Sequence, residues 1–367
     1  MTSLGWHRPA AVIRLRAAAA VRGERILGFL VLAYVALLPF QLPINNEINF
    51  APADVFLLLI LPLAAASLKY CKPAWSAWHS ALPLVFIIST FFCALRNGSL
   101  SRYVWLNKDV GLLLLLFSYL TITSVATDWD QVRQILRVFT LSVVVQNQVA
   151  IVSFGVAYAR GIDTVFTMYD GRRLAGLLLD PNAYGGLLGV ALAICEGASW
   201  GEAPLFRRGL LLYCRLNLLL GILFTFSRSA WISLSLSLLL LCAFRTTKAI
   251  QLALAVLVAA PCVLLLMGPG FLLFFEDMAG RPERGISRFA LIRDAWTQFT
   301  QHPILGGGIG SFVDMEGTIV HNTTLWFLAD FGIPGFAVLL GFLGWFLFAG
   351  WFAYGQAPLK YKPIVCC

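Results

Sequence analysis

The chain is a succession of apolar runs, and this feature limits its possible folds more than any single motif does. The first run starts at Ile26, after a leader rich in arginine. A helix needs roughly 17 to 25 apolar residues to cross about 30 Å of hydrocarbon, and the runs reach or approach that length. Because lipid offers no water to the backbone, each run is predicted to be a helix. Nine further runs follow, at residues 53–68, 81–95, 110–127, 135–159, 183–200, 210–226, 230–244, 249–275 and 323–354.

Composition supports the same class of protein. Of 367 residues, 59% are hydrophobic and 12% are charged, and the mean hydropathy of +0.81 excludes an ordinary soluble globular protein. The alternating ten-residue pattern of a membrane barrel is missing from the sequence. We therefore predict an all-α polytopic membrane protein with about ten transmembrane helices. Its predicted parts are a cytoplasmic basic leader at residues 1–25, nine transmembrane helices at 26–275, an outer loop at 276–322, a last transmembrane helix at 323–354 and a cytoplasmic tail at 355–367.

The distribution of basic residues orients these spans. More of the 27 lysines and arginines fall in inside segments than in outside ones, as expected if both termini are cytoplasmic. The outside set is still large for short loops. Its charges are either solvated beside lipid headgroups, or they form a cradle of guanidinium groups for an anion such as phosphate. The outside set comprises Arg96, Arg102, Lys108, Arg160, Arg172, Arg173, Arg228, Arg281, Arg284, Arg288 and Arg293.

Arg228 is the sharpest candidate for such a cradle. It lies in the sequence TFSRSAW, between two apolar runs with almost no loop to separate them. Its charge cannot easily reach bulk water there and needs a partner. Arg172 and Arg173 precede the sequence DPN at residues 180–182, where a span begins and a helix N-terminus would add donors for phosphate. Either arginine could equally pair with a neighbouring aspartate.

The outer loop at residues 276–322 carries four of the outside arginines at its front. Ser287 is a candidate N-cap for a short amphipathic helix that continues through Arg288 and Arg293. Apolar side chains recur at helical spacing along it, so one face of this helix should lie on the membrane or on other spans. These side chains are Ile286, Phe289, Ile292, Trp296 and Phe299.

The glycine-rich sequence GGGIG at residues 306–310 resembles a nucleotide-binding loop only superficially. No predicted strand precedes it, no phosphate-loop lysine follows it, and the full GxGxxG spacing is missing. We expect a flexible or tight turn that lets the chain fold back over the membrane.

His321 and Asn322 stand where the last apolar run begins on the outer face. An isolated histidine often has a structural role. At this position, however, the imidazole could act as a general base near neutral pH, and the amide of Asn322 could orient a substrate.

Metal ions and nucleic acid are not expected partners. The first outer segment offers only Glu47, with Asp54 just inside the next span, so a carboxylate pair for a divalent ion is missing and arginines would supply the charge compensation. No cofactor is predicted. The formal charge of +9 is spread over short loops without a basic stripe, which favours anionic lipids or an anionic substrate over nucleic acid.

Four motifs in this order resemble the O-antigen ligase and polymerase superfamily of bacterial membrane glycosyltransferases. They are RLAG from Arg173 with DPN ending at Asn182, TFSRSAW around Arg228, SRF around Arg288 followed by HPILGGGIG at residues 302–310, and His321-Asn322 followed by GIPG at residues 332–335. Each motif is weak alone, and the likeness covers residues 172–348.

The resemblance implies an inverting, metal-independent transfer on the periplasmic face of the inner membrane. The donor would be a glycan on an undecaprenyl pyrophosphate carrier, and the acceptor a hydroxyl of lipid A core or of another glycan, or in some branches of a protein. Arg228 and Arg288 would stabilise the pyrophosphate, Arg172 or Arg173 would assist, and His321 would take the acceptor proton. Arg284, Arg293, Asn182 and Asn322 are further candidates for substrate binding. Relative to many members, the C-terminal region is expected to be shortened.

A transporter or flippase for a lipid-linked glycan is the alternative. Such a protein needs ionisable side chains near the middle of the membrane. The candidates in this sequence are Arg215, Glu196 and Asp330.

Overall fold

The computed structural model divides into two compact units, Met1–Ala74 with Leu114–Ser235 and Trp75–Leu113 with Leu236–Cys367, and we describe each unit by itself. The structure describes residues 26–43, 49–67, 75–97, 105–126, 128–169, 171–178, 180–201, 204–242, 250, 251, 254, 257, 282–317, 320 and 322–365.

The described residues are overwhelmingly helical, which confirms the predicted all-α membrane fold in outline. Six of their helices are long and apolar enough to cross a membrane, at Ala77–Leu95, Lys108–Val125, Trp129–Arg160, Pro181–Trp200, Arg208–Thr225 and Thr323–Gln356. Two shorter apolar helices lie at Ile26–Leu37 and Pro52–Leu63. Most of the run at residues 249–275 lies outside the described residues, so the count of ten stays a prediction.

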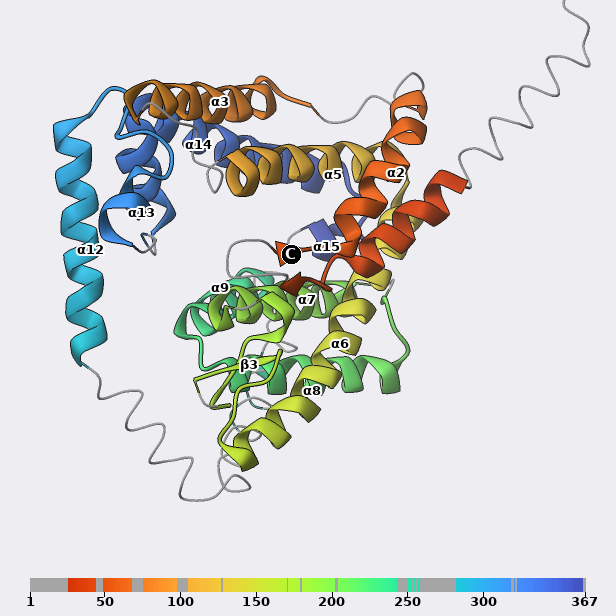
Figure 1. The fold of residues 1–367 in the computed structure, drawn as a ribbon. Helices are drawn as coiled ribbons and strands as arrows, with labels where there is room; N and C mark the ends of the chain where they lie inside the picture. Colours follow the sequence, from red (N-terminus) through yellow and green to blue (C-terminus); the bar gives the residue numbers. More distant parts are fainter. Residues whose placement is uncertain are drawn as a thin grey trace, which may run out of the picture. The chain divides into compact units, whose positions relative to one another are not determined.

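In the first unit, α7 packs against α8, and α6 packs against both (Figure 1). The helix Ile26–Leu37 and α2 form a separate apolar cluster with parts of α5 and α6. The helices of this unit are Ile26–Leu37, α2 (Pro52–Ser67), the later part of α5 (Gly111–Val125), α6 (Trp129–Arg160), α7 (Pro181–Trp200), α8 (Arg208–Thr225) and the start of α9 (Arg228–Cys242). Two short antiparallel pairs, β1 (Leu42–Pro43) with β2 (Asn49–Phe50) and β3 (Thr167–Met168) with β4 (Arg173–Leu174), and the 3-10 turn η2 (Gly176–Leu178) complete it.

Buried amides join the helices of the first unit. Asn147 on α6 donates to the backbone and side-chain oxygens of Asn217 on α8, at 2.7 and 2.9 Å, and accepts from the hydroxyl of Tyr184 on α7 at 3.0 Å. A Cβ at Gly221 would come within 2.3 Å of the Asn147 amide, so only glycine allows this approach. Such bonds hold spans together where lipid cannot satisfy polar groups.

In the second unit, α14 packs along α3 and α12 (Figure 1). Its apolar core joins Phe86 of α3 to Phe327 and Phe331 of α14. The helices of this unit are α3 (Ala77–Asn97), the π-helix η1 (Trp105–Val110), α12 (Pro282–Gln301), α13 (Ser311–Glu316), α14 (Thr323–Gln356) and α15 (Lys362–Val365).

A kink divides α14. Gly332 has φ 65° and ψ −161°, a conformation that only glycine adopts readily. The N–H of Ile333 donates to the carbonyl of Pro303 at 2.9 Å instead of continuing the helix ladder, and Pro334 contributes no N–H. The apolar run predicted at residues 323–354 is therefore two helical segments rather than one straight span.

The predicted N-cap of the loop helix is wrong. α12 begins at Pro282, five residues before Ser287, so Ser287 lies inside the helix. Proline is well tolerated in the first turn of a helix because its missing N–H would have no partner there. The helix spans 20 residues and is longer than the short segment that the sequence predicted.

Candidate functional site

Two residues, Phe226 and Ser227, join α8 to α9. Phe226 ends α8 in the left-handed conformation, with φ 50°, and its N–H donates to the carbonyl of Leu223 at 3.1 Å. This conformation is strained for a residue with a side chain, so the surroundings must hold it. The predicted near-absence of a loop before Arg228 is confirmed, and Arg228 is the first residue of α9.

Arg173 of β4 stabilises the junction between α8 and α9, at residues 225–228, which we call the corner. Its side chain is buried, and its Nε–H donates to the carbonyl of Thr225 at 2.9 Å. That carbonyl belongs to the last turn of α8, where the helix leaves acceptors without partners. The guanidinium also lies 5.7 Å from the centre of the Tyr169 ring. Arg173 therefore has a structural bond that the sequence did not reveal, and a direct contact with substrate stays a prediction.

The N-termini of α7 and α9 are linked by side chains. The hydroxyl of Ser227 donates to the amide oxygen of Asn182 at 3.0 Å and accepts from the N–H of Ala230, so Ser227 caps α9. Asp180 caps α7 by accepting from the backbone N–H of Asn182 at 2.9 Å. The motif that contains Asn182 and the motif that contains Arg228 thus meet within one unit.

Gly185 allows the two helices to approach this closely. A Cβ at Gly185 would lie 2.7 Å from the Cβ of Ala230 and 3.0 Å from the hydroxyl oxygen of Thr225. Real Cβ atoms do not come this near to a methyl group, so any larger residue would push α9 away from α7. The glycine fixes the spacing between the first turns of the two helices.

Arg228 and Arg172 present their side chains at the surface of this unit, whereas Arg173 is buried. Arg228 forms no ion pair with any residue in the described part of the chain. Because a guanidinium in the first turn of a helix lies next to exposed backbone N–H groups, Arg228 and the start of α9 can bind one anionic group together.

In the second unit, the glycine-rich segment wraps around Asp330 of α14. One carboxylate oxygen accepts from the N–H of Gly310 at 2.9 Å and from the indole N–H of Trp326 at 2.7 Å. The other accepts from the hydroxyl of Ser311 at 3.2 Å and more weakly from the N–H of Phe312 at 3.4 Å. Asp330 therefore caps α13 from a neighbouring helix, and the expected tight turn is confirmed.

Close backbone packing completes this turn. The N–H groups of Gly307 and Gly308 donate to the carbonyls of Ala329 and Asp330, at 2.7 and 3.0 Å. A Cβ at Gly306 would lie 2.4 Å from the backbone of Asp330. Gly306 therefore lies directly on the backbone of α14, whereas a Cβ at Gly307 would meet Gln298 of α12 and one at Gly308 would meet Cys93 of α3.

The remaining loop arginines belong to α12. Arg284 and Arg288 lie in this helix, and their side chains are outside the described residues. Arg293 is exposed and its Nε lies 3.4 Å from the neighbouring Asp294 carboxylate. A pair at this distance on the surface adds little stability. Substrate binding by these three arginines stays a prediction.

His321, the predicted base, lies outside the described residues, while its neighbours are described. Val320 is buried in a small cluster with Ala295 and Phe312. Asn322 caps α14, because its amide oxygen accepts from the N–H of Leu325 at 3.1 Å. The order of asparagine, two threonines and an apolar run is a sequence signal for a helix start, although this capping role was not among the predictions.

A family model described as O-antigen ligase matches residues 216–340. This match over about a third of the chain supports the O-antigen ligase and polymerase superfamily. The predicted resemblance is thereby confirmed. Together with the apolar helices, the match indicates a multi-pass membrane protein of the bacterial inner membrane. Searches of curated proteins and of solved structures found no match.

The O-antigen ligase match includes the corner at Arg228, all of α12 and the turn around Asp330. It leaves out Arg172, and also Arg173 and Asn182, which contact the corner from earlier in the chain. No group of three His, Cys, Asp or Glu side chains in the described ranges is arranged to hold a metal ion.

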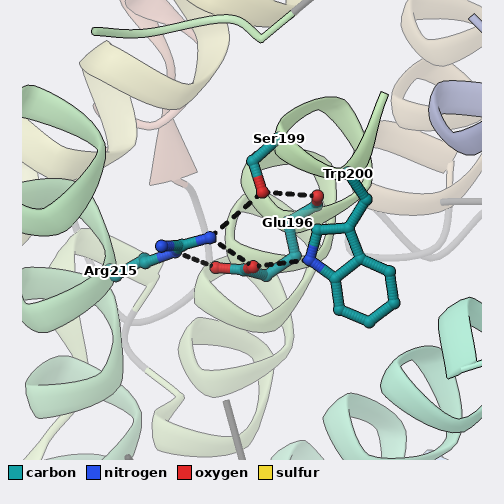
Figure 2. A network of polar contacts seen from close by, with 4 residues as sticks. All are labelled: Glu196, Ser199, Trp200 and Arg215. Atoms are coloured by element: carbon teal, nitrogen blue, oxygen red, sulfur yellow. Dashed lines mark hydrogen bonds and ion pairs between the residues drawn. The ribbon is translucent and has the colours of Figure 1, made fainter. Parts of the chain in front are cut away.

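Two residues proposed for transport lie before the O-antigen ligase match and form an ion pair, in which Glu196 is buried and Arg215 is partly exposed (Figure 2). Arg215 on α8 binds both carboxylate oxygens of Glu196 on α7 through Nε and Nη2, with the Nη2 contact at 2.7 Å. Ser199 accepts from Arg215 at 3.0 Å, and the indole of Trp200 donates to Glu196 at 3.0 Å. Every bond joins α7 to α8 or lies within α7, so the network links these two helices to each other.

Proposed function

We propose that the protein is an inner-membrane glycosyltransferase of the O-antigen ligase or surface-polysaccharide polymerase type. Its donor is a glycan on undecaprenyl pyrophosphate, and its acceptor is a hydroxyl of a glycan or of lipid A core on the periplasmic face. The O-antigen ligase match supports the reaction class. The donor, the acceptor and the orientation come from the family resemblance and from the distribution of basic residues.

The main observation in support of this proposal is that side chains link the N-terminus of α7 to the N-terminus of α9. Ser227 and Asn182 join the two helices at 3.0 Å, and Arg228 stands exposed in the first turn of α9. Arg173 fixes the end of α8 just before the corner. A rigid corner that presents a permanent positive charge beside helix N–H groups suits a phosphate of the carrier.

In the proposed reaction the acceptor oxygen attacks the anomeric carbon from the face opposite the leaving group. A new glycosidic bond forms, and the bond between that carbon and the pyrophosphate oxygen breaks with inversion. The bonding electrons leave on undecaprenyl pyrophosphate, whose growing negative charge Arg228 and Arg288 stabilise. His321 accepts the proton of the acceptor hydroxyl. No step requires a metal ion, because arginines supply the positive charge.

A complementation assay in a deletion strain tests the proposal. Arg228→Ala should abolish the surface glycan made by this protein while its level in the membrane stays normal. Arg208→Ala removes an exposed arginine from the start of α8 and serves as the matched control, with transfer retained. Full-length glycan in the Arg228→Ala strain would overturn the proposal. In the deletion strain, loss of long chains identifies a polymerase, and accumulation of unattached lipid-linked chains identifies a ligase.

A further inference from the structure

α12 has three faces with different surroundings. One face is buried against α13 and α14 through Leu291, Ala295 and Gln298. The second is apolar and exposed, with Phe289, Ile292 and Trp296 at exposed fractions of 75%, 40% and 51%. The ring of Phe299 lies 5.3 Å from that of Trp296 and extends the apolar face. The third face is polar, with Thr297 and Gln301 exposed to solvent.

α12 carries too many charged residues to be a transmembrane span. The helix has the length of one, with 20 residues, but it carries Glu283, Arg284, Arg288, Arg293 and Asp294. Arg293 lies at the border between the apolar and polar faces, and 78% of its side chain is exposed. A guanidinium beside a row of aromatic and aliphatic side chains is the pattern of a helix that lies in the membrane surface, with the charge reaching the phosphate layer.

The direction of α12 agrees with this pattern. α12 runs across the direction of α3 and of the later half of α14, within the second unit (Figure 1). After the kink at Gly332, α14 continues for 24 residues to Gln356, which is about 36 Å of helix and enough to cross the hydrocarbon core. If α3 and this segment cross the bilayer, α12 lies parallel to its surface.

We propose that α12 lies in the headgroup layer of the bilayer. Its apolar face, defined by Phe289, Ile292, Trp296 and Phe299, enters the boundary of the acyl chains, and Arg293 binds lipid phosphates. The occupant of this face is therefore phospholipid, with anionic headgroups favoured by the arginines of the helix. The inference does not depend on the proposed enzyme activity.

Photocrosslinking of the full-length protein in phospholipid nanodiscs tests the inference. p-Benzoylphenylalanine replaces Phe289 or Trp296 on the apolar face, and Thr297 or Gln301 on the polar face as matched controls. Each variant is first required to elute as a single folded species. Mass spectrometry should find lipid adducts at positions 289 and 296, at least fivefold more than at 297 and 301.

Three results would overturn it. Adducts between position 289 or 296 and another segment of the chain would mean that protein covers this face. A lack of any adduct there would mean that the face is exposed to water. Equal lipid adducts at all four positions would mean that α12 is surrounded by lipid rather than lying in the surface.

Discussion

The carboxylate of Glu196 is almost fully removed from solvent, and one guanidinium balances its charge. An ion pair of this kind contributes little net stability compared with apolar packing, but loss of one partner leaves a buried charge uncompensated. Arg215→Met should therefore lower the free energy of unfolding by about 3 kcal/mol. Thermal unfolding of the purified protein in detergent measures the change.

The double variant Glu196→Gln with Arg215→Met is the control for this ion pair. It removes both charges, and the Gln amide can still accept from Trp200. It should recover at least half of the stability lost in Arg215→Met. A double variant that is less stable than Arg215→Met would show that the charges themselves are needed.

Ser227 links the two helices of the proposed site through one hydroxyl. Ser227→Ala removes the bond to Asn182 and the cap of α9, each worth roughly 1 kcal/mol. Because Arg228 is the next residue, we expect transfer to fall about tenfold while the protein level in the membrane changes little. Glycan transfer in the complementation assay measures the effect.

The controls for this variant are Ser227→Thr and Ser235→Ala. Threonine keeps the hydroxyl and should restore most of the transfer, whereas Ser235 is exposed on the same helix and its loss should have no effect. Normal transfer by Ser227→Ala would mean that the link between α7 and α9 does not position Arg228.

Among the elements, α14 depends most on one backbone conformation. Gly332 has positive φ, and a Cβ there would lie 2.5 Å from the carbonyl oxygen of Ile304. Gly332→Ala should therefore destabilise the fold by more than about 2 kcal/mol, because strain and the clash act together. We expect most of the variant to be lost from the membrane, as measured by size-exclusion chromatography of detergent extracts.

Gly344→Ala is the matched control in the same helix. A Cβ at Gly344 meets no atom within 4 Å, and its backbone is helical, so alanine should be neutral or slightly stabilising. Normal amounts of folded Gly332→Ala protein would contradict the assigned kink.

The positions of the helices could be predicted from the sequence more accurately than the contacts between them. The apolar runs at residues 183–200 and 210–226 predicted α7 and α8 to within about two residues, because each run must be helical in lipid. The start of α12 was missed, since residues 282–287 carry no apolar pattern that separates helix from loop. Outside the apolar runs, helix boundaries depend on tertiary packing, which cannot be predicted from the local sequence.

The roles of individual polar residues were harder to predict. The carbonyl of Thr225 lies 52 residues from Arg173 in sequence, so no local pattern could reveal that bond. Asp330 looked like an ionisable group for transport, but most of its donors come from residues 310–312, which lie 18 to 20 residues earlier. The exposed position of Arg228 was not predicted. The short connection before it suggested a charge that cannot easily reach bulk water, but the side chain is exposed at the start of α9.

At the scale of the whole molecule, the side of the membrane on which α12 lies depends on α9. Between Arg208, at the start of α8, and Thr297 of α12 the chain contains α8, α9 and the run at residues 249–275. If all three cross the bilayer, Arg208 and Thr297 lie on opposite faces. α9 has 15 residues, or about 22 Å of helix, and is the shortest of the three.

Cysteine labelling counts these crossings. Both side chains are exposed, so Thr297→Cys and Arg208→Cys should react with a maleimide once it reaches them. A membrane-impermeant maleimide should label Thr297→Cys in intact spheroplasts, and Arg208→Cys only after lysis, because the proposed orientation puts α12 outside. The parent chain supplies the background, and three of its cysteines, Cys93, Cys195 and Cys214, are buried. Labelling of both positions before lysis would mean an even number of crossings, and the proposed periplasmic position of α12 would then require the start of α8 to be periplasmic as well.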